Sequence, residues 1–509
     1  MYAKITSMGS FALDGFVVTV EADLSGGLPS FEVVGLPDNA VKESRDRVRS
    51  ALKNTGFTFP VSRITVNLAP ADIRKTGPVY DLPVLLAILS ASGQLPAPGP
   101  ESAFLGELSL DGAVRGAAGV LTMALAARAR GVRRFFVPAD NAREAAAVEG
   151  LEICAVHTVA ELAAHLRGET PLVPVPPTPF DAQPDETLPD FADVCGQLEA
   201  RRALEIAAAG HHNVLLVGPP GTGKSMLAKR LPSILPPLSR AEALATTEIY
   251  SAAGLLPRGA GLMTARPFRS PHHSVSAMAL AGGGSTPRPG EVSLAHNGVL
   301  FLDELPEFKR DALEILRQPM EDGQVTVSRV AASATFPSSF LLAAAMNPCP
   351  CGYFGHPTKP CTCTPSAIDR YRERISGPLL DRLDLHVEVP PVEYESLSGK
   401  QGGEPSSAIL ARVSAARRRQ QQRYEADGIS CNARLTPALQ RRWCRVTPEA
   451  DRLLHAAFEK LGLSARGYGR VLRVARTIAD LAGDEVISTA HISEAIQYRN
   501  LDRKYWHSR

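Results

Sequence analysis

The chain has 509 residues, and its 55 basic and 53 acidic side chains leave a formal net charge of +2. This length allows about three domains, and the balanced charge excludes an overall basic field, so any affinity for nucleic acid must come from local patches. The apolar runs are too short for a membrane helix and the eight cysteines do not suggest a disulfide framework, so we predict a cytoplasmic protein without membrane contact.

Residues 1–167 alternate short strands and helices. Segments 16–20, 31–34 and 63–68 have strand composition, and residues 38–54 are amphipathic with Asp38 as a candidate N-cap. We therefore predict an α/β domain over residues 1–167. Residues 168–190 are rich in proline and then polar, which predicts a semi-rigid extended linker.

A phosphate-binding motif lies within residues 213–225, Asn-Val-Leu-Leu-Val-Gly-Pro-Pro-Gly-Thr-Gly-Lys-Ser. It predicts a buried strand that turns through glycines into a helix, so that backbone N–H groups face a triphosphate. Lys224 would neutralise phosphate charge, and Ser225 would ligate Mg²⁺. We expect the helix to end or kink at Pro232. The predicted ATP-binding residues are Gly218, Pro219, Pro220, Gly221, Thr222, Gly223, Lys224 and Ser225.

A second buried strand, residues 298–304, ends in two carboxylates. At the carboxyl end of a strand in an open α/β sheet, Asp303 would hold Mg²⁺ and Glu304 would polarise the attacking water. About 75 residues separate this strand from the phosphate loop, which predicts an insertion. Within it, His272 and His273 make a poor chelate, and we expect them to form loop hydrogen bonds or to contact a polyanion.

Beyond this strand we predict a helix over 308–322 and a hairpin over 324–336, with Arg329 near the turn. Arg329 could track a nucleic-acid backbone in the channel of a ring; an exposed turn arginine is the alternative. A buried strand, 340–347, ends in Asn347, whose amide can orient the attacking water or sense the γ-phosphate.

Four cysteines follow in two close pairs, which are Cys349, Cys351, Cys361 and Cys363. Four thiolates in two pairs joined by a short loop can satisfy tetrahedral Zn²⁺. The Cys-x-Cys spacing is tighter than the usual Cys-x-x-Cys, and reduced loop thiols are the alternative.

Arg382 lies where a ring ATPase of this type would project an arginine into the neighbouring subunit's nucleotide site. Residues after about 405 are largely helical, and residues 447 onward predict a helical lid. Arg466 and Arg473, seven residues apart, share one helix face, and we expect one of them to reach the nucleotide phosphates. The sequence does not choose between them.

The N-terminal segments 75–83 and 106–119 resemble the proteolytic domain of Lon-type Ser–Lys proteases. That family places its nucleophilic serine and its lysine where this chain has Val79 and Leu121. Because aliphatic side chains cannot serve as nucleophile and base, we predict no peptidase activity and expect this domain to act as a scaffold or as a ring for oligomerisation and DNA contact.

Segments 218–225, 290–304, 347–352 and 376–384 resemble the magnesium-chelatase-like AAA+ ATPases, and nearly the whole chain is similar to the ComM/YifB family. The resemblance implies an α/β fold with a Lon/S5-like domain (1–167), a linker (168–190), an AAA+ P-loop core (191–395) and a helical linker with a C-terminal lid (396–509). It also implies a homohexameric, ATP- and Mg²⁺-dependent helicase that drives branch migration of single-stranded or branched DNA in homologous recombination during natural transformation. A chelatase subunit and a protein unfoldase are the alternatives.

Overall fold

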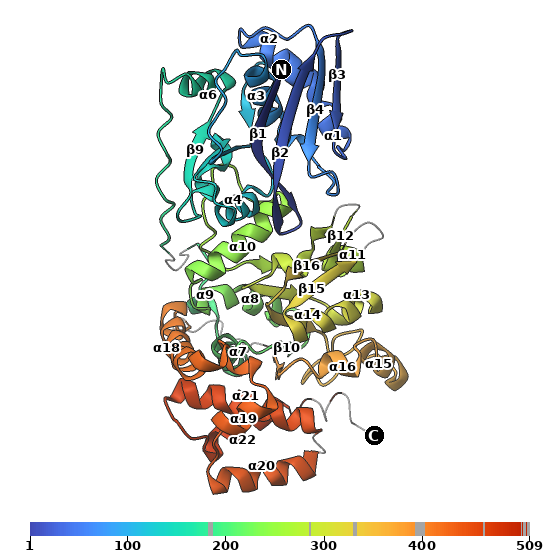
Figure 1. Ribbon diagram of the computed structural model, residues 1–509. Helices are drawn as coiled ribbons and strands as arrows, with labels where there is room; N and C mark the ends of the chain where they lie inside the picture. The colour runs from blue at the N-terminus through green and yellow to red at the C-terminus, as the bar shows by residue number, and fades with distance from the viewer. Residues whose placement is uncertain are drawn as a thin grey trace.

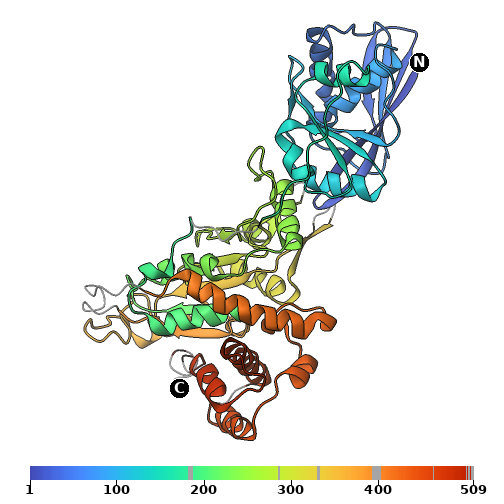
Figure 2. The ribbon, with the colours of Figure 1, turned by 90° about the vertical axis from the view of Figure 1, so that its left-hand side faces the viewer.

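The structure, a computed structural model, describes residues 1–181, 187–284, 287–328, 333–391, 403–461, 464–499, 501 and 505. Three regions follow one another along the long axis of the molecule (Figure 1). An N-terminal α/β region lies at one end, a second α/β region forms the middle, and a helical region lies at the other end. Figure 2 shows that the N-terminal region leans to one side of this axis. Each described helix is too short or too polar to cross a membrane.

The N-terminal region is built on a mixed seven-stranded sheet in the order β3-β4-β2-β1-β5-β8-β9. Pairs β1–β2 and β2–β4 are antiparallel, and the remaining pairs are parallel. Apolar side chains alternate along β1, so that Ile5 faces the core beneath α3 and Met8 faces the core beneath α4. The strands are β1 Tyr2–Phe11, β2 Asp14–Ser25, β3 Ser30–Val34, β4 Arg63–Ala69, β5 Ser102–Phe104, β8 Arg134–Pro138 and β9 Glu152–Val156, and a small hairpin joins β6 Glu107–Leu108 to β7 Val114–Arg115.

Helices cover both faces of this sheet (Figure 1). The helix predicted over 38–54 is divided into α1 and α2, and the predicted N-cap is confirmed because Asp38 Oδ1 accepts a hydrogen bond from the Val41 amide at 2.8 Å. The helices are α1 Asn39–Lys42, α2 Ser44–Asn54, α3 Asp81–Ala91, α4 Val120–Ala129, α5 Ala142–Ala145 and α6 Val159–Leu166.

The middle region contains a parallel five-stranded sheet in the order β11-β14-β17-β10-β18. The residues of β10, β14 and β17 are all buried, as expected for strands covered by helices on both faces. Strand β10 lies between β17 and β18, so the loop after it emerges among the carboxyl ends of its neighbours. The strands are β10 Val214–Val217, β11 Phe268–Arg269, β14 Val299–Leu302, β17 Leu341–Met346 and β18 Leu385–Glu388.

The helices of the middle region agree with the sequence in most places. The helix after the phosphate loop ends at Lys229, and a separate short helix begins at Leu231 with Pro232 in its first turn, which is the expected break. The helix predicted over 308–322 is present as two segments. The helices are α7 Leu198–Gly210, α8 Lys224–Lys229, α9 Leu231–Ile234, α10 Arg240–Ala253, α11 Ala277–Ala281, α12 Glu291–Leu294, α13 Arg310–Ile315, α14 Arg317–Asp322, α15 Pro365–Arg372 and α16 Gly377–Leu380.

Two hairpins belong to the insertions of this region. The hairpin predicted over 324–336 is confirmed, because β15 Gln324–Ser328 pairs antiparallel with β16 Ser333–Pro337. Its turn, which contains Arg329, lies outside the described residues. The other hairpin pairs β12 Gly282–Gly283 with β13 Arg288–Pro289.

Helix α10, part of the predicted insertion, connects the middle region to the N-terminal region. It packs against α4, where Thr122 Oγ1 donates to Glu248 Oε1 at 3.1 Å and the Gly119 amide donates to the Ser251 carbonyl at 2.9 Å. Leu244 of α10 packs against the apolar cluster of the N-terminal region. The insertion therefore serves as the docking surface between the two regions.

The C-terminal region is helical, as predicted. Its longest helix, α18, lies alongside α7 of the middle region and continues the apolar core of that region (Figure 2). Buried Asp480 of α21 receives ion pairs from Arg423 and Arg476 and a hydrogen bond from Asn432 at 2.8 Å, which fixes α21 against α18. The helices are α18 Ser406–Tyr424, α19 Pro437–Trp443, α20 Pro448–Leu461, α21 Ala465–Ala482 and α22 Thr489–Gln497.

Candidate nucleotide site

The phosphate loop follows β10 at the carboxyl end of the sheet. Gly218 has no room for a side chain, because a Cβ atom there would lie 2.2 Å from the Val389 carbonyl oxygen. Gly221 and Gly223 have φ angles of 78° and 87°, which favour glycine, and Gly223 is the N-cap of α8. The backbone thus forms the turn that the motif predicts, with a helix N-terminus behind it.

Lys224 points into this loop. Its Nζ donates to the carbonyls of Gly218 and Pro219 at 2.7 and 2.8 Å and to Asn347 Oδ1 at 3.2 Å. Burial lowers the pKa of Lys224 to about 8, although the carboxylates of Asp303 and Glu304 act in the opposite direction. A triphosphate bound in the loop would supply the negative charge that keeps this amine protonated.

Two oxygen ligands meet beside the lysine. Ser225 Oγ donates to Asp303 Oδ2 at 2.5 Å, although the two residues are 78 positions apart. A hydroxyl and a carboxylate oxygen are ligands that Mg²⁺ accepts in nucleotide sites. The residues present therefore fit a magnesium ion held by Ser225 and Asp303, which would reduce the negative charge of bound ATP.

Glu304 has an unusual backbone. Its φ angle is 52°, in the left-handed region, where residues other than glycine are uncommon. Its amide donates to Asp303 Oδ1 at 2.9 Å, and His273 Nδ1 lies 3.2 Å from Glu304 Oε2. The side chain is about half exposed, so that water can reach it. The sequence assigned His273 only to a loop, and its contact with Glu304 depends on the tertiary fold.

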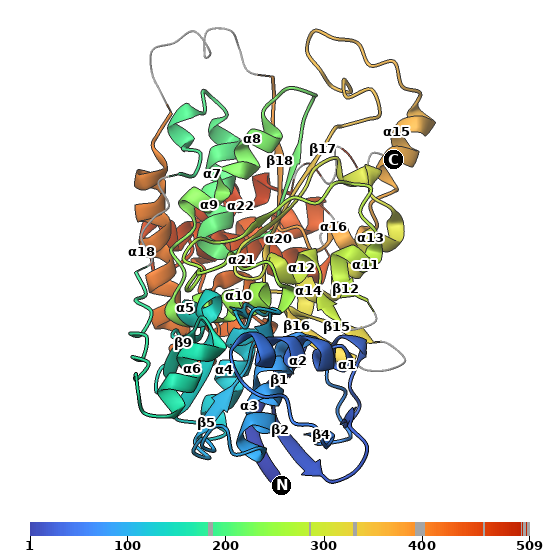
Figure 3. The ribbon, with the colours of Figure 1, turned by 90° about the horizontal axis from the view of Figure 1, so that it is seen from above.

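The four cysteines lie close together in the loop between β17 and α15. Figure 3 shows the backbone of this loop, which extends beyond β17 and returns to α15. Their sulfur atoms are all within 4.8 Å of one another, and Sγ–Sγ distances of 3.4, 3.7 and 3.6 Å separate the pairs 349–351, 349–361 and 351–361. Four ligands at about 2.3 Å from a tetrahedral Zn²⁺ would be about 3.8 Å apart. The residues present therefore fit a metal ion.

This cysteine loop also touches the phosphate loop. A Cβ atom on Gly352 would lie 2.5 Å from Pro220 Cδ, and Gly352 has a φ angle of 83°. Asn347, which accepts from Lys224, is only two residues before Cys349. The metal-binding loop and the nucleotide site are therefore packed together.

Arg382 lies at the amino-terminal ends of the parallel strands, whereas Lys224 lies at their carboxyl-terminal ends. Asn213, immediately before β10, donates through Nδ2 to the Arg382 carbonyl at 3.0 Å, and its own carbonyl accepts from the Asp384 amide at 2.9 Å. Lys224 follows the other end of β10. Since a strand of four residues spans about 13 Å, Arg382 is remote from the phosphate loop of its own protomer.

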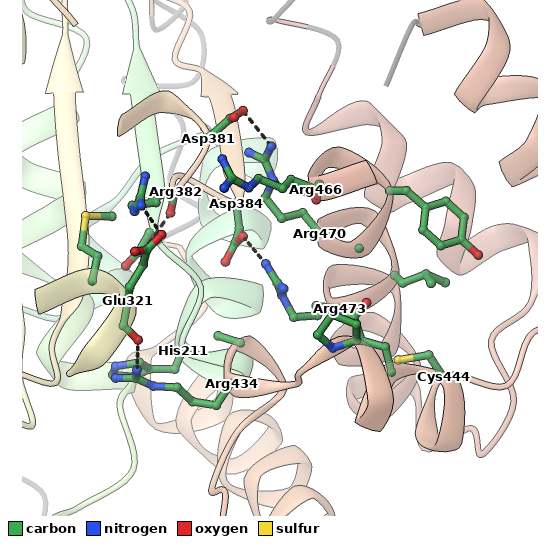
Figure 4. Close-up of a pocket in the computed structure, with 18 of the residues that line it drawn as sticks. His211, Glu321, Asp381, Arg382, Asp384, Arg434, Cys444, Arg466, Arg470 and Arg473 are labelled. Carbon is green, nitrogen blue, oxygen red and sulfur yellow. Dashed lines mark hydrogen bonds and ion pairs between the residues drawn. The ribbon is translucent and has the colours of Figure 1, made fainter. Parts of the chain in front are cut away.

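The lid arginines surround a cavity of about 860 Å³ beside Arg382 (Figure 4). Arg470 is buried and pairs with Asp381 at 2.9 Å, and Arg473 pairs with Asp384 at 3.4 Å. Arg466 is exposed and forms no ion pair with the described residues. Of the two residues left open by the sequence, Arg466 is thus the one available to an anion entering the cavity.

The anchor of this cluster is Asp384. Its burial opposes ionisation, but the hydrogen bond with His212 and the charges of Arg473 and Arg470 hold its pKa well below the usual range. His212 Nδ1 lies 3.0 Å from Asp384 Oδ2, and its Nε2 lies 2.7 Å from Thr477 Oγ1. Arg473 is therefore held as part of a buried polar network.

Val79 and Leu121 occupy apolar surroundings in the N-terminal region. Val79 contributes to the packing of both apolar clusters of that region, and Leu121 is fully buried on α4. These two side chains therefore contribute to apolar packing in the N-terminal region.

Three family models match consecutive parts of the chain. They are described as subunit ChlI of Mg-chelatase (residues 20–141), magnesium chelatase, subunit ChlI (residues 190–397), and the C-terminal part of that subunit (residues 403–499). The matches cover all three regions of the structure.

Two full-length relatives and one partial relative place these matches in context. The YifB protein of Escherichia coli (strain K12) is 45% identical over 96% of this chain and 95% of its own length. Competence protein ComM of Haemophilus influenzae is 43% identical over 98% of both chains. Lon protease of Acinetobacter baumannii is 29% identical over 35% of this chain and 23% of its own length.

Proposed function

We propose that this chain, which belongs to the ComM/YifB family of magnesium-chelatase-like AAA+ proteins, is an ATP-driven motor that moves DNA strands as a homohexameric ring. Its role would be helicase-type branch migration of single-stranded or branched DNA during recombination of incoming DNA, which accords with the similarity to a competence protein. We place this activity in the cytoplasm.

The main support for a ring is that the charged residues of the nucleotide site form two separate groups within one protomer. Lys224, Ser225 and Asp303 lie at the carboxyl edge of the sheet, whereas Arg382 and Arg466 lie at the amino edge. Each protomer would therefore supply the phosphate-binding residues of one nucleotide site and the arginines of the next. Head-to-tail packing of protomers, which closes into rings, brings the two halves together.

The chemistry follows from the residues of both halves. Lys224 and the backbone of the phosphate loop would bind the phosphates, and Asn347 and Glu304 would orient the attacking water, with Glu304 accepting its proton. Arg382 of the neighbouring protomer would stabilise the charge that develops on the γ-phosphate. We propose Arg466 as the lid arginine that joins it, because Arg470 and Arg473 are already paired with aspartates.

The β15–β16 hairpin is our candidate for DNA contact. It projects from the end of α14, and Arg329 of its turn is proposed to follow a phosphate backbone. Alternation between open and closed subunit interfaces would move this hairpin as a rigid body.

The test is branch migration of a synthetic Holliday junction with ATP. We expect the wild-type protein to separate the junction into two duplexes by branch migration. Lys224→Ala should be inactive, because that variant loses the cation of the phosphate loop. Lys229→Ala, at the far end of the same helix, is the matched control. A wild-type protein that hydrolyses ATP but leaves every branched DNA intact would contradict the motor proposal.

The alternative is a remodelling ATPase of the chelatase or unfoldase kind that does not act on DNA. The family matches to a chelatase subunit favour it. ATP hydrolysis stimulated by forked DNA, in a salt-dependent manner, would support the DNA motor, whereas stimulation by unfolded protein alone would support the alternative.

We further propose that Cys349, Cys351, Cys361 and Cys363 hold one Zn²⁺. Their sulfur spacing fits a closed tetrahedral site, which is the structural type of zinc site. Because Gly352 packs against Pro220, such an ion would brace the phosphate loop as well as its own loop.

We expect the purified protein to contain about one zinc per chain and the double variant Cys351→Ser, Cys361→Ser to contain none, as measured by plasma mass spectrometry. The same double variant should bind a fluorescent ATP analogue more weakly, since the phosphate loop loses its support. Cys195→Ser, a free cysteine outside the cluster, should retain both properties. Unchanged zinc in the double variant would refute the site.

A further inference from the structure

The guanidinium of Arg382 is held by acceptors of its own protomer (Figure 4). One Nη donates to the Pro378 carbonyl at 2.6 Å, and the other is paired with the carboxylate of Glu321. The arginine side chain is only 13% exposed, whereas that of Glu321 is 57% exposed. Because these N–H groups are occupied, Arg382 must leave Glu321 before it can donate both of them to a phosphate of a neighbouring protomer.

Glu321 lies next to the base of the β15–β16 hairpin. It is the penultimate residue of α14, and Gly323, with a φ angle of 68°, turns the chain directly into β15. The Ser338 amide donates to the Gly323 carbonyl at 2.8 Å and closes the base of the hairpin. Only Asp322 and Gly323 lie between Glu321 and β15, so a displacement of the hairpin base would act directly on the end of α14 that carries Glu321.

The C-terminal region also contacts the base of the hairpin, through Arg434. Arg434 donates to the Glu321 carbonyl at 3.4 Å and to Ser339 Oγ at 2.8 Å, and so connects the segment before the hairpin to the segment after it. Glu321 and Arg434 thus line the same cavity as Arg382, at the base of the hairpin.

We infer that Glu321 is a positioning residue that retains Arg382 in its own protomer and releases it when the hairpin is displaced by DNA. The inference rests on the proposed role of Arg382 at the subunit interface. It assigns to Glu321 the coupling between DNA contact and ATP hydrolysis: the same helix end that carries the hairpin also carries the carboxylate that competes with phosphate for the arginine.

The test compares Glu321→Gln with Asp322→Asn in assays of ATP hydrolysis with and without DNA. The two substitutions remove the same charge from adjacent exposed residues of α14, but of these two carboxylates it is that of Glu321 that pairs with Arg382. Loss of an ion pair of this exposure would shift the equilibrium between paired and released Arg382 about fivefold towards release. We therefore expect Glu321→Gln to hydrolyse ATP about fivefold faster without DNA and to lose the corresponding part of its stimulation by DNA, with an unchanged melting temperature. Asp322→Asn should behave as the wild type.

Arg382→Ala, assayed in parallel, separates the possible failures. If Arg382→Ala is inactive and Glu321→Gln matches Asp322→Asn, the inference fails and the proposed function stands. If Glu321→Gln is as slow as Arg382→Ala, Glu321 assists hydrolysis and does not restrain the arginine, which also overturns the inference. Full activity of Arg382→Ala would instead remove the proposed role of the arginine. If Glu321→Gln hydrolyses ATP about fivefold faster but DNA does not change the rate of the wild type, Glu321 retains Arg382 and the proposed link to DNA is refuted.

Discussion

Glu304→Gln is expected to lower the rate of ATP hydrolysis by about three orders of magnitude while leaving ATP bound. The substitution keeps the size of the side chain and its capacity to meet His273, but it removes the carboxylate that accepts a proton from water. Lys224, Ser225 and Asp303, which bind the phosphates and the metal, are unchanged. The measurement is phosphate release under saturating ATP, beside the affinity for a fluorescent ATP analogue.

Glu307→Gln is the matched control for this prediction. Glu307 lies three residues further along the chain and forms an exposed ion pair with Arg374 at 2.8 Å. It should hydrolyse ATP at nearly the wild-type rate, because exposed pairs of this kind contribute little. A Glu304→Gln protein with the same rate as Glu307→Gln would show that another group activates the water.

Arg382→Ala is expected to lower hydrolysis by about 10³-fold with little loss of ATP affinity. Its guanidinium lies at the amino edge of the sheet and does not touch the phosphate loop of its own protomer. The effect should therefore come entirely from the site of the neighbour. Arg317→Ala, which removes a half-exposed arginine on the same helix as Glu321, should remain active.

Mixed rings test directly whether the arginine acts between protomers. Co-expression of Glu304→Gln and Arg382→Ala chains with different affinity tags gives rings in which about a quarter of the interfaces combine an intact Glu304 with an intact Arg382. We expect hydrolysis to reappear at that proportion, although neither parent is active. Mixed rings as inactive as both parents would mean that each nucleotide site is complete within one protomer.

The parts of the site that are contiguous in sequence could be predicted from the sequence alone. The phosphate loop, Asp303 and Asn347 each follow a buried apolar strand, and parallel strands bring their carboxyl ends to one edge. The cysteine pairs were also recognisable, because only 12 positions separate Cys349 from Cys361.

The remaining features depend on contacts between distant segments. Arg466 and Arg473 share a helix face, and the sequence could not choose between them because the aspartate that occupies Arg473 is 89 positions away. Similarly, Glu321 meets Arg382 across 61 positions, and His273 reaches Glu304 from a loop without regular periodicity. Side-chain pairing of this kind is decided by the tertiary fold and leaves no local pattern.

Helix α10 ties the N-terminal region to the middle region of the chain. The helix lies between β10 and β14 in the sequence, yet Leu244 on it packs against the apolar cluster of the N-terminal region. In a shortened chain that starts near the linker, Leu244 and the rest of this face of α10 would be exposed to water. If protomers assemble as proposed, each N-terminal region would therefore be carried along by its own ATPase core, because α10 belongs to one region and packs against the other.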